Sequence, residues 1–112
     1  MPRDYKLYLG DLLEASERIQ EYIKKMSLSD FEHSKITIDA VVHNLEVIGE
    51  AARKLPPEIK AKSLEIEWPK IVALRNILAH EYFGVNTQIV WDIVQNKLRP
   101  IHAACRRLLE GD

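Results

Sequence analysis

Apolar residues recur every three or four positions along most of this sequence, a spacing typical of amphipathic helices. The first such run follows Asp4, a favourable N-cap, and continues to about Met26. No segment alternates apolar and polar residues between turn signals, as a half-buried strand would. The sequence therefore predicts an all-α fold, a four- to five-helix up-and-down bundle.

Glycines and prolines mark the limits of a second helix, expected over residues 35–55. The Pro56-Pro57 pair ends it, because proline cannot continue an α-helix. Gly49 falls on its apolar face, where another helix can approach closely. Before this helix, Ser29 and Glu32 have the spacing of a capping box for a short turn.

A third helix is expected over residues 68–82, with Pro69 in its first turn and Gly84 as its C-terminal cap. The fourth begins after Asn86, its predicted N-cap. Pro100 should kink or divide this last helix, because it removes a backbone donor and crowds the preceding turn.

Length and composition predict a single domain over residues 1–112, with one core. Apolar residues make up 46% of the chain and charged residues 29%, a mix typical of globular proteins. No apolar run approaches the roughly 20 residues needed to span a bilayer, and no signal-peptide core is visible. The single cysteine, Cys105, fits a reducing cytoplasm and is expected to be a buried thiol.

The charge balance excludes one class of nucleic-acid binder. With 16 Lys and Arg against 17 Asp and Glu, the formal net charge is −1. A broad basic surface is therefore not expected, and contact with a polyanion must come from a local cluster. Exposed basic pairs such as Arg106 and Arg107 are expected to be solvated charge, although some can guide a nucleic acid.

The third helix carries an arginine within the sector that it has to bury. On a wheel of about 100° per residue, Arg75 lies among large apolar residues such as Leu74. Asn76 and His80 are four residues apart and lie together at the edge of that sector. Ala79 lies between, so the pattern predicts a notch bounded by a guanidinium, an amide and an imidazole.

Two interpretations of this notch remain open from the residues alone. A buried arginine needs a partner, and Glu46 or Glu50 of the second helix can supply a structural ion pair. Alternatively the notch is an anion site, because a planar guanidinium suits phosphate and a histidine suits proton transfer near neutral pH. A metal site built on His43, Glu46 and Glu50 is disfavoured without further histidines or cysteines, so no metal is expected.

The stretch RNILAHEY resembles the R-x-x-x-x-H-x-Y signature of the HepT-like proteins, a branch of the HEPN superfamily. Further segments resemble that family in the same order along the chain: YLGDLLEASERIQEYI, AVVHNLEVIGEAARKLP, WPKIVALRNILAHEYFGV and IVWDIV. One local departure is the LRP of residues 98–100, where many relatives place proline directly after leucine.

This resemblance implies a helical bundle that dimerises and acts as a metal-independent endoribonuclease, with no cofactor. In such families the enzyme is the toxin of a toxin–antitoxin pair, and its partner is a minimal nucleotidyltransferase that adenylylates the motif tyrosine. By position, the implied catalytic residues are Arg75 and His80 with Asn76 in support, and the implied modification site is Tyr82.

The chemistry of RNA fits these residue types. The 2′-hydroxyl is an internal nucleophile, so cleavage needs a base, an acid and positive charge on the phosphorane rather than a metal-bound hydroxide. His80 can act as base or acid, and Arg75 can stabilise the phosphate charge. One protomer offers one motif histidine, so we expect a two-fold dimer that pairs the third and fourth helices around a shared cleft.

A rival hypothesis assigns the chain no catalysis. In it, the chain is a helical module that binds a minimal nucleotidyltransferase or its nucleotide, and the notch holds a phosphate but does not cleave RNA.

Other residues have no expected role at the notch. His33 and His102 are expected at the surface, and Trp68 and Trp91 in the core or an interface. On the helical pattern alone, Tyr82 would pack with its hydroxyl at the rim of the helix.

Overall fold

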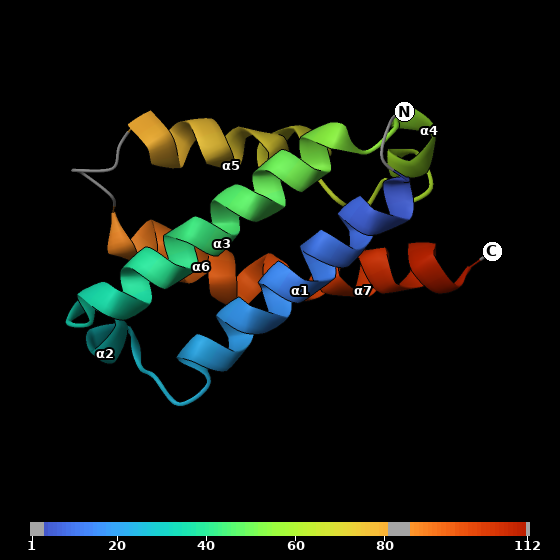
Figure 1. Cartoon of the computed structure of the whole chain (residues 1–112). Coiled ribbons are helices and arrows are strands. Elements are labelled where there is room, and N and C mark those ends of the chain that lie inside the picture. The colour runs from blue at the N-terminus through green and yellow to red at the C-terminus, as the bar shows by residue number, and fades with distance from the viewer. Residues whose placement is uncertain (1–3, 81–85, 112) are drawn as a thin grey trace.

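A computed structural model describes residues 4–80 and 86–111; the side chains of Arg75, Ile77, Ala79 and His80 are outside the described part. Within these ranges the chain forms helices and no strand, which confirms the all-α prediction (Figure 1). The helices are α1 (Tyr5–Ile23), α2 (Leu28–Glu32), α3 (Lys35–Lys54), α4 (Pro57–Lys60), α5 (Trp68–His80), α6 (Thr87–Asn96) and α7 (Leu98–Glu110).

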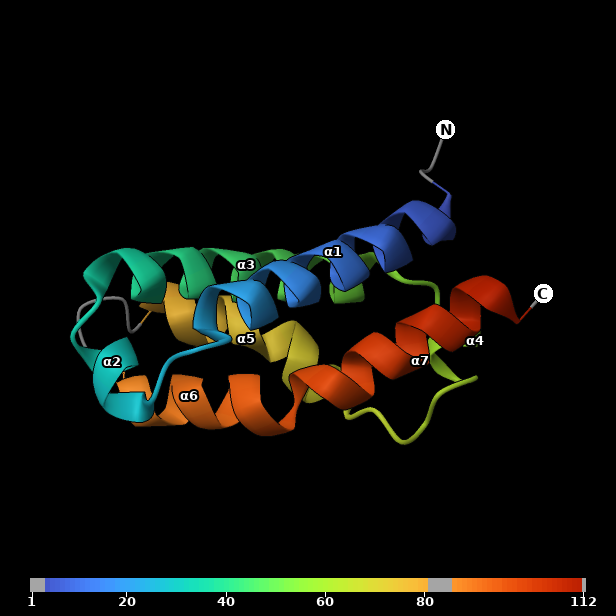
Figure 2. The same cartoon turned by 90° about the horizontal axis from the view of Figure 1, so that it is seen from below.

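Five longer helices make the bundle, and α2 and α4 are short connecting turns. α3 packs along both α1 and α5, α1 also packs against α7, and α2 bridges α3 and α6. The view in Figure 2 places α1 and α3 in one layer and the consecutive helices α6 and α7 in the opposite layer. Around the bundle, α5 is therefore followed by α3, then α1, then the α6–α7 pair. Among the described residues, the α6–α7 pair packs only weakly back against α5.

The core lies where these helices face one another. Buried apolar side chains recur at helical spacing on α1, α3 and α7, as the periodicity predicts. The largest side chains with no measurable exposure include Leu9, Leu12, Ile19, Phe31, Leu45, Ile48 and Leu98. Cys105 is also fully buried, and its desolvation raises the pKa of the thiol to about 12.

The first helix boundaries follow the predicted caps, with one correction. Asp4 caps α1 by accepting a hydrogen bond from the amide of Lys6 at 2.9 Å. The capping box of α2 is formed by Ser27 and Asp30, not by Ser29 and Glu32. Ser27 directly precedes the helix and can adopt the extended backbone of an N-cap, whereas the predicted pair already lies inside the helix.

The later boundaries also follow the sequence signals. Asn86 caps α6, where its Oδ1 accepts from the amides of Gln88 at 2.9 Å and Ile89 at 3.2 Å. The predicted fourth helix is divided at Lys97 into α6 and α7. Pro100 is the third residue of α7, where a missing amide breaks no intrahelical bond. The expected cap at Gly84 lies outside the described residues.

Two other features bear on the helix packing. Gly49 is buried on α3, the helix that packs against α5, as its place on the apolar face predicts. None of the helices in the described ranges combines the length and hydropathy required to cross a membrane.

The core predicts a large difference between two leucine truncations. Leu12→Ala removes a side chain with 0% exposure and leaves a cavity, so it should lower the free energy of unfolding by about 2–5 kcal/mol. Leu64→Ala makes the same chemical change at a side chain that is 81% exposed, and should change stability by less than about 0.5 kcal/mol. Urea unfolding followed by circular dichroism measures both. Equal decreases in the two variants would contradict this packing.

Candidate active site

The start of α5 is fixed by a buried tryptophan. The Nε1 of Trp68 donates to the carbonyl oxygens of Lys60 at 3.1 Å and Ser63 at 3.0 Å. These bonds tie Trp68 to the last residue of α4 and to the connector that follows it, while the indole ring is buried in the core. Trp68 is therefore a core residue, as predicted, and it sets where the motif helix begins.

The body of α5 packs its apolar residues on more than one side. Ile71, Leu74 and Leu78 are buried, whereas Val72 and Ala73 are half-buried. A helix with apolar residues on several sides needs cover on more than one flank. α3 covers one flank, and the flank toward α6 and α7 is only partly filled.

The predicted site residues fall in the second half of this helix. Arg75 and Asn76 follow the buried Leu74, and His80 is the last residue of α5. The Asn76 side chain is exposed, in agreement with its predicted place at the edge of the apolar sector. Tyr82 lies outside the described residues, as do the side chains of Arg75 and His80, so the notch remains a prediction.

The acidic candidates for pairing with Arg75 lie on α3. Glu50 contacts cations of its own helix: its carboxylate lies 2.6 Å from Arg53 and 3.6 Å from Lys54. These contacts raise the pKa of Arg53, first through the hydrogen bond to Glu50 and then through its charge. Glu46 is half-buried on the same helix. No group of three or more potential metal ligands occurs among the residues that the structure describes.

The helix that follows the motif is held to α2. The hydroxyl of Thr87 donates to Glu32 at 3.1 Å, and the rings of Phe31 and Trp91 lie 5.3 Å apart at 41°. Trp91 thus packs against the core, in line with its predicted role. The body of α5, before the motif, and the start of α6, after it, therefore both pack against other helices.

A groove of about 370 Å³ lies between α5 and the α6–α7 junction, and sequence reasoning missed it. Its walls include Ile71, Leu74 and Ile93, and its rim carries Lys70 and Lys97. Because Ala73 and Leu74 directly precede Arg75, the groove reaches the part of α5 that carries the motif. The signal in the sequence is the apolar character of α5 on more than one side.

The apolar surface continues from this groove along α6. Ile89 lies one helical turn before Ile93 and is 59% exposed. Large exposed apolar side chains that adjoin an apolar groove are typical of surfaces that contact another protein. This is the flank on which a second helix layer would complete the cover of α5.

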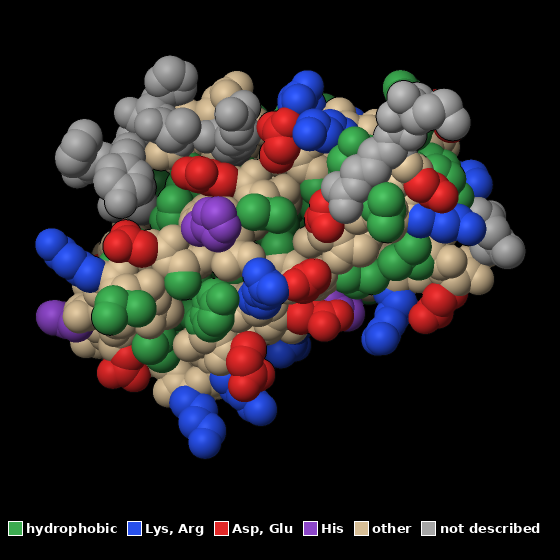
Figure 3. Space-filling view, in the orientation of Figure 1, with side chains coloured by type: hydrophobic (Ala, Val, Ile, Leu, Met, Phe, Trp, Pro, Cys, Tyr) green, Lys and Arg blue, Asp and Glu red, His purple; other side chains and the backbone are tan. Residues whose placement is uncertain are grey.

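Several charges elsewhere on the surface are paired. Lys70 lies 2.8 Å from Glu67, a contact that lowers the pKa of Glu67 and raises the pKa of Lys70. Arg107 bonds to Glu65, whose pKa is lowered first by a backbone hydrogen bond and then by this arginine. Acidic and basic side chains alternate across the α1–α3 face in Figure 3, so this face shows no field of a single sign.

The remaining histidines are surface residues, as predicted. The His33 ring lies 2.7 Å from the carbonyl oxygen of Ser29 and is exposed. The His102 side chain is partly exposed on α7, and its Nε2 lies 3.1 Å from Glu17 of α1.

Comparison with known proteins connects this arrangement to one family. The profile described as "Ribonuclease HepT-like" matches residues 12–108. A "Probable ribonuclease HepT" of Thermococcus cleftensis is 35% identical over 108 residues, which cover 96% of this chain and 98% of that protein. A "Putative RNase" of Caldanaerobacter subterraneus subsp. tengcongensis is 34% identical over 105 residues, 94% of each chain.

A third relative is longer. The "Gamma-glutamylcyclotransferase and putative RNase" of Methanocaldococcus jannaschii is 36% identical over 110 residues, and this chain spans half of its length. No solved structure matches the chain.

Proposed function

Because the chain belongs to the HepT-like ribonuclease family, we propose that it is a metal-independent endoribonuclease, with Arg75 and His80 as its catalytic pair. The observation that carries this proposal is the R-x-x-x-x-H-x-Y motif in the second half of a helix whose outer flank is open. The exposed Asn76 beside Arg75 supports it, because a polar residue at that edge can contact a phosphate or orient the imidazole.

The proposed reaction uses the nucleophile that RNA carries. His80 accepts the proton of the 2′-hydroxyl as its oxygen attacks the adjacent phosphorus, or donates one to the departing 5′-oxygen. Arg75 stabilises the charge that develops on the phosphorane oxygens. The bond to the 5′-oxygen breaks as the ring closes, which leaves a 2′,3′-cyclic phosphate and a 5′-hydroxyl. DNA lacks the hydroxyl and should not be cleaved.

Cleavage of single-stranded RNA in EDTA tests this assignment. His80→Ala should lower kcat by about 10²–10⁴-fold, because the step loses its proton carrier. Arg75→Ala should lower it by about 10²–10³-fold, because the phosphorane charge is no longer stabilised. Leu64→Ala changes an exposed side chain away from the proposed catalytic pair and serves as the control, with activity within about twofold of the unchanged protein.

Two outcomes of this assay would contradict the proposal. Full activity in both variants would indicate a contaminating nuclease. No cleavage of varied RNAs by protein with unmodified Tyr82 would favour the rival, a non-catalytic module that binds a nucleotidyltransferase or its nucleotide.

A two-fold dimer through the open flank of α5 forms part of this proposal. The groove between α5 and the α6–α7 junction, together with Ile89, supplies an apolar surface beside the motif helix. A second copy on this surface would bring its own Arg75 and His80 to a shared cleft and complete the cover of α5.

Substitution of one exposed residue separates this surface from others. Ile89→Asp should convert the dimer to monomers at micromolar concentration, because it places a charge in the apolar interface. Ile36→Asp is the matched control, since Ile36 is 85% exposed on α3 and is not part of the groove. Light scattering after size-exclusion chromatography measures the mass. Monomers of the unchanged protein, or dimers of Ile89→Asp, would exclude this interface.

We further propose that the chain is the toxin of a toxin–antitoxin pair whose partner is a minimal nucleotidyltransferase that adenylylates Tyr82. Tyr82 lies seven residues after Arg75 in the sequence, a separation equal to two turns of a regular helix. An adenylyl group there would add bulk and negative charge next to the cation that binds the RNA phosphate, and would block it.

Mass spectrometry after co-expression with a minimal nucleotidyltransferase encoded beside the gene tests this control. An adenylyl group should appear on the peptide that contains Tyr82, and RNA cleavage should fall with its occupancy. Tyr82→Phe removes the acceptor oxygen and should stay unmodified and active in the same cells. An unmodified Tyr82 would reject this mode of control without affecting the nuclease assignment.

A further inference from the structure

Two cations, Lys24 and Arg99, lie at the C-terminal end of α1 and at the start of α7. Some arginines and lysines near other helix ends are paired with carboxylates, as in Arg53 with Glu50 or Arg107 with Glu65. Lys24 and Arg99, by contrast, form no ion pair with any described residue. Both line one groove of about 470 Å³ between α1 and the α6–α7 region. A cation without a carboxylate partner is available to an anionic ligand, although two carboxylates also line this groove.

The rest of this groove suits a flexible polyanion. Gln20 and Gln95 provide neutral donors and acceptors, and Ile23 and Val94 provide an apolar floor. The acidic residues of the lining are Glu17 and Glu21. One carboxylate oxygen of Glu17 lies 3.1 Å from the His102 ring, so it is directed toward α7.

An exposed aromatic ring lies in the adjoining hollow. This second hollow, lined by Tyr22, Lys25, Met26 and Asp30, shares Glu21 and Lys24 with the first. Tyr22 is 40% exposed, the largest exposure of an aromatic ring among the described residues. The Asp30 carboxylate accepts from the amide of Ser27 in the capping box, so it is held toward its own helix. An exposed ring that lines the same hollow as two lysines suits single-stranded nucleic acid, because bases can stack on the ring while phosphates contact the cations.

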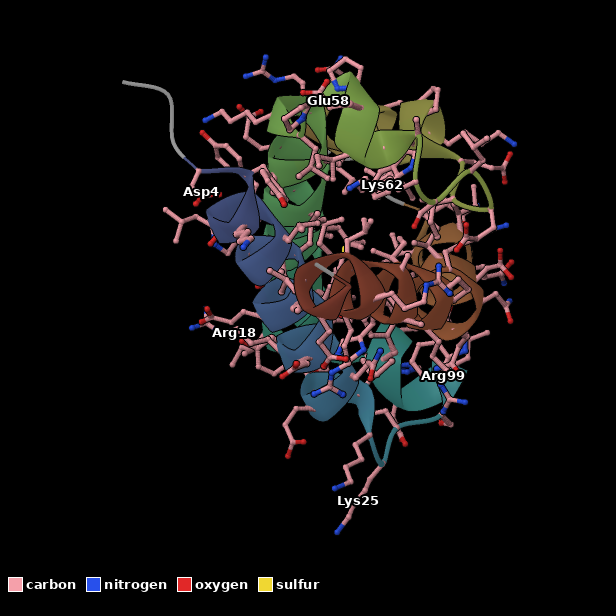
Figure 4. The ribbon with its side chains drawn as sticks, turned by 90° about the vertical axis from the view of Figure 1, so that its right-hand side faces the viewer. Asp4, Arg18, Lys25, Glu58, Lys62 and Arg99 are labelled. Atoms are coloured by element: carbon pink, nitrogen blue, oxygen red, sulfur yellow. The ribbon has the colours of Figure 1, made fainter. Side chains whose placement is uncertain are left out.

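We propose that Lys24, Arg99 and Tyr22, with Lys25, form a binding strip for single-stranded RNA outside the catalytic motif. Figure 4 shows Lys25 and Arg99 on the same lower side of the molecule, away from Glu58 and Lys62. The motif helix α5 lies on the opposite, upper side in Figure 1. The strip therefore holds a flanking stretch of the strand, which crosses the α6–α7 pair to reach the motif. Its biological meaning rests on the proposed ribonuclease function.

Single-stranded DNA is the probe that separates the strip from the nuclease. The strip recognises phosphates and base faces, which DNA shares, whereas cleavage requires the 2′-hydroxyl. Fluorescence anisotropy of a labelled 12-nucleotide DNA at low salt therefore measures binding without turnover. Lys24→Ala with Arg99→Ala should weaken binding about tenfold. The slope of the logarithm of the binding constant against the logarithm of the salt concentration should decrease in magnitude by about 0.7 for each phosphate that is no longer neutralised.

A matched double variant controls for net charge. Lys6→Ala with Lys35→Ala removes the same number of charges from exposed positions outside both hollows, and should leave affinity within about twofold. Tyr22→Ala should weaken binding about fivefold or more, whereas Tyr22→Phe keeps the stacking face and should bind like the unchanged protein. With RNA as substrate, Lys24→Ala with Arg99→Ala should raise KM and leave kcat unchanged.

Two results would overturn the strip. One is an equal decrease of affinity in the two double variants, which would assign binding to net charge alone. The other is an unchanged protein that does not bind the DNA at low salt. Neither result depends on cleavage. If the protein binds DNA through the strip but does not cut RNA, the proposed function is wrong and the proposed strip still stands.

Discussion

The packing of α5 chiefly against α3, among the residues that the structure describes, is the constraint on which the rest of the structure depends. α3 contacts α1 on one side and α5 on the other, and the buried Gly49 on α3 suits a close approach of the motif helix. α5 is nevertheless apolar on more than one side, so a single neighbour leaves part of it uncovered. The open flank beside the motif follows from that mismatch. A surface of this kind is suited to a second subunit, and it lies beside the residues proposed to cut RNA.

The architecture was largely readable from the sequence because its signals are local. Helical spacing needs only neighbouring residues, and Asp4, Asn86 and the Pro56-Pro57 pair mark ends by backbone chemistry that does not depend on tertiary contacts. The division of the last helix near Pro100 is of the same kind. The capping box of α2 was misplaced by two residues because Ser27 and Ser29 both precede acidic residues at the required spacing. The extended backbone of Ser27 and the burial of Phe31 both accompany the turn that forms.

The candidate site was readable only in part. Arg75, Asn76, His80 and Tyr82 stand out because their types are unexpected on an apolar helix and match a family signature. The groove beside α5 and the strip at the end of α1 could not be predicted, because each joins residues distant in the chain. Lys24 and Arg99 are 75 positions apart, and nothing in either local sequence indicates that they share one hollow. Neither Lys24 nor Arg99 forms an ion pair with a described carboxylate, and this too depends on the fold and not on the local sequence.

This distribution of partners resolves an apparent difficulty for a ribonuclease with a net charge of −1. Net charge counts every cation equally, but a cation paired with a carboxylate offers little to a phosphate. Pairs such as Lys70 with Glu67 and Arg18 with Glu14 remove cations from this count without changing the total. In the proposed strip, Lys24 and Arg99 would contact RNA because neither is paired with a carboxylate in the part of the chain that the structure describes. A near-neutral protein can therefore bind a polyanion at one place, modestly and with strong dependence on salt, while the rest of its surface stays indifferent.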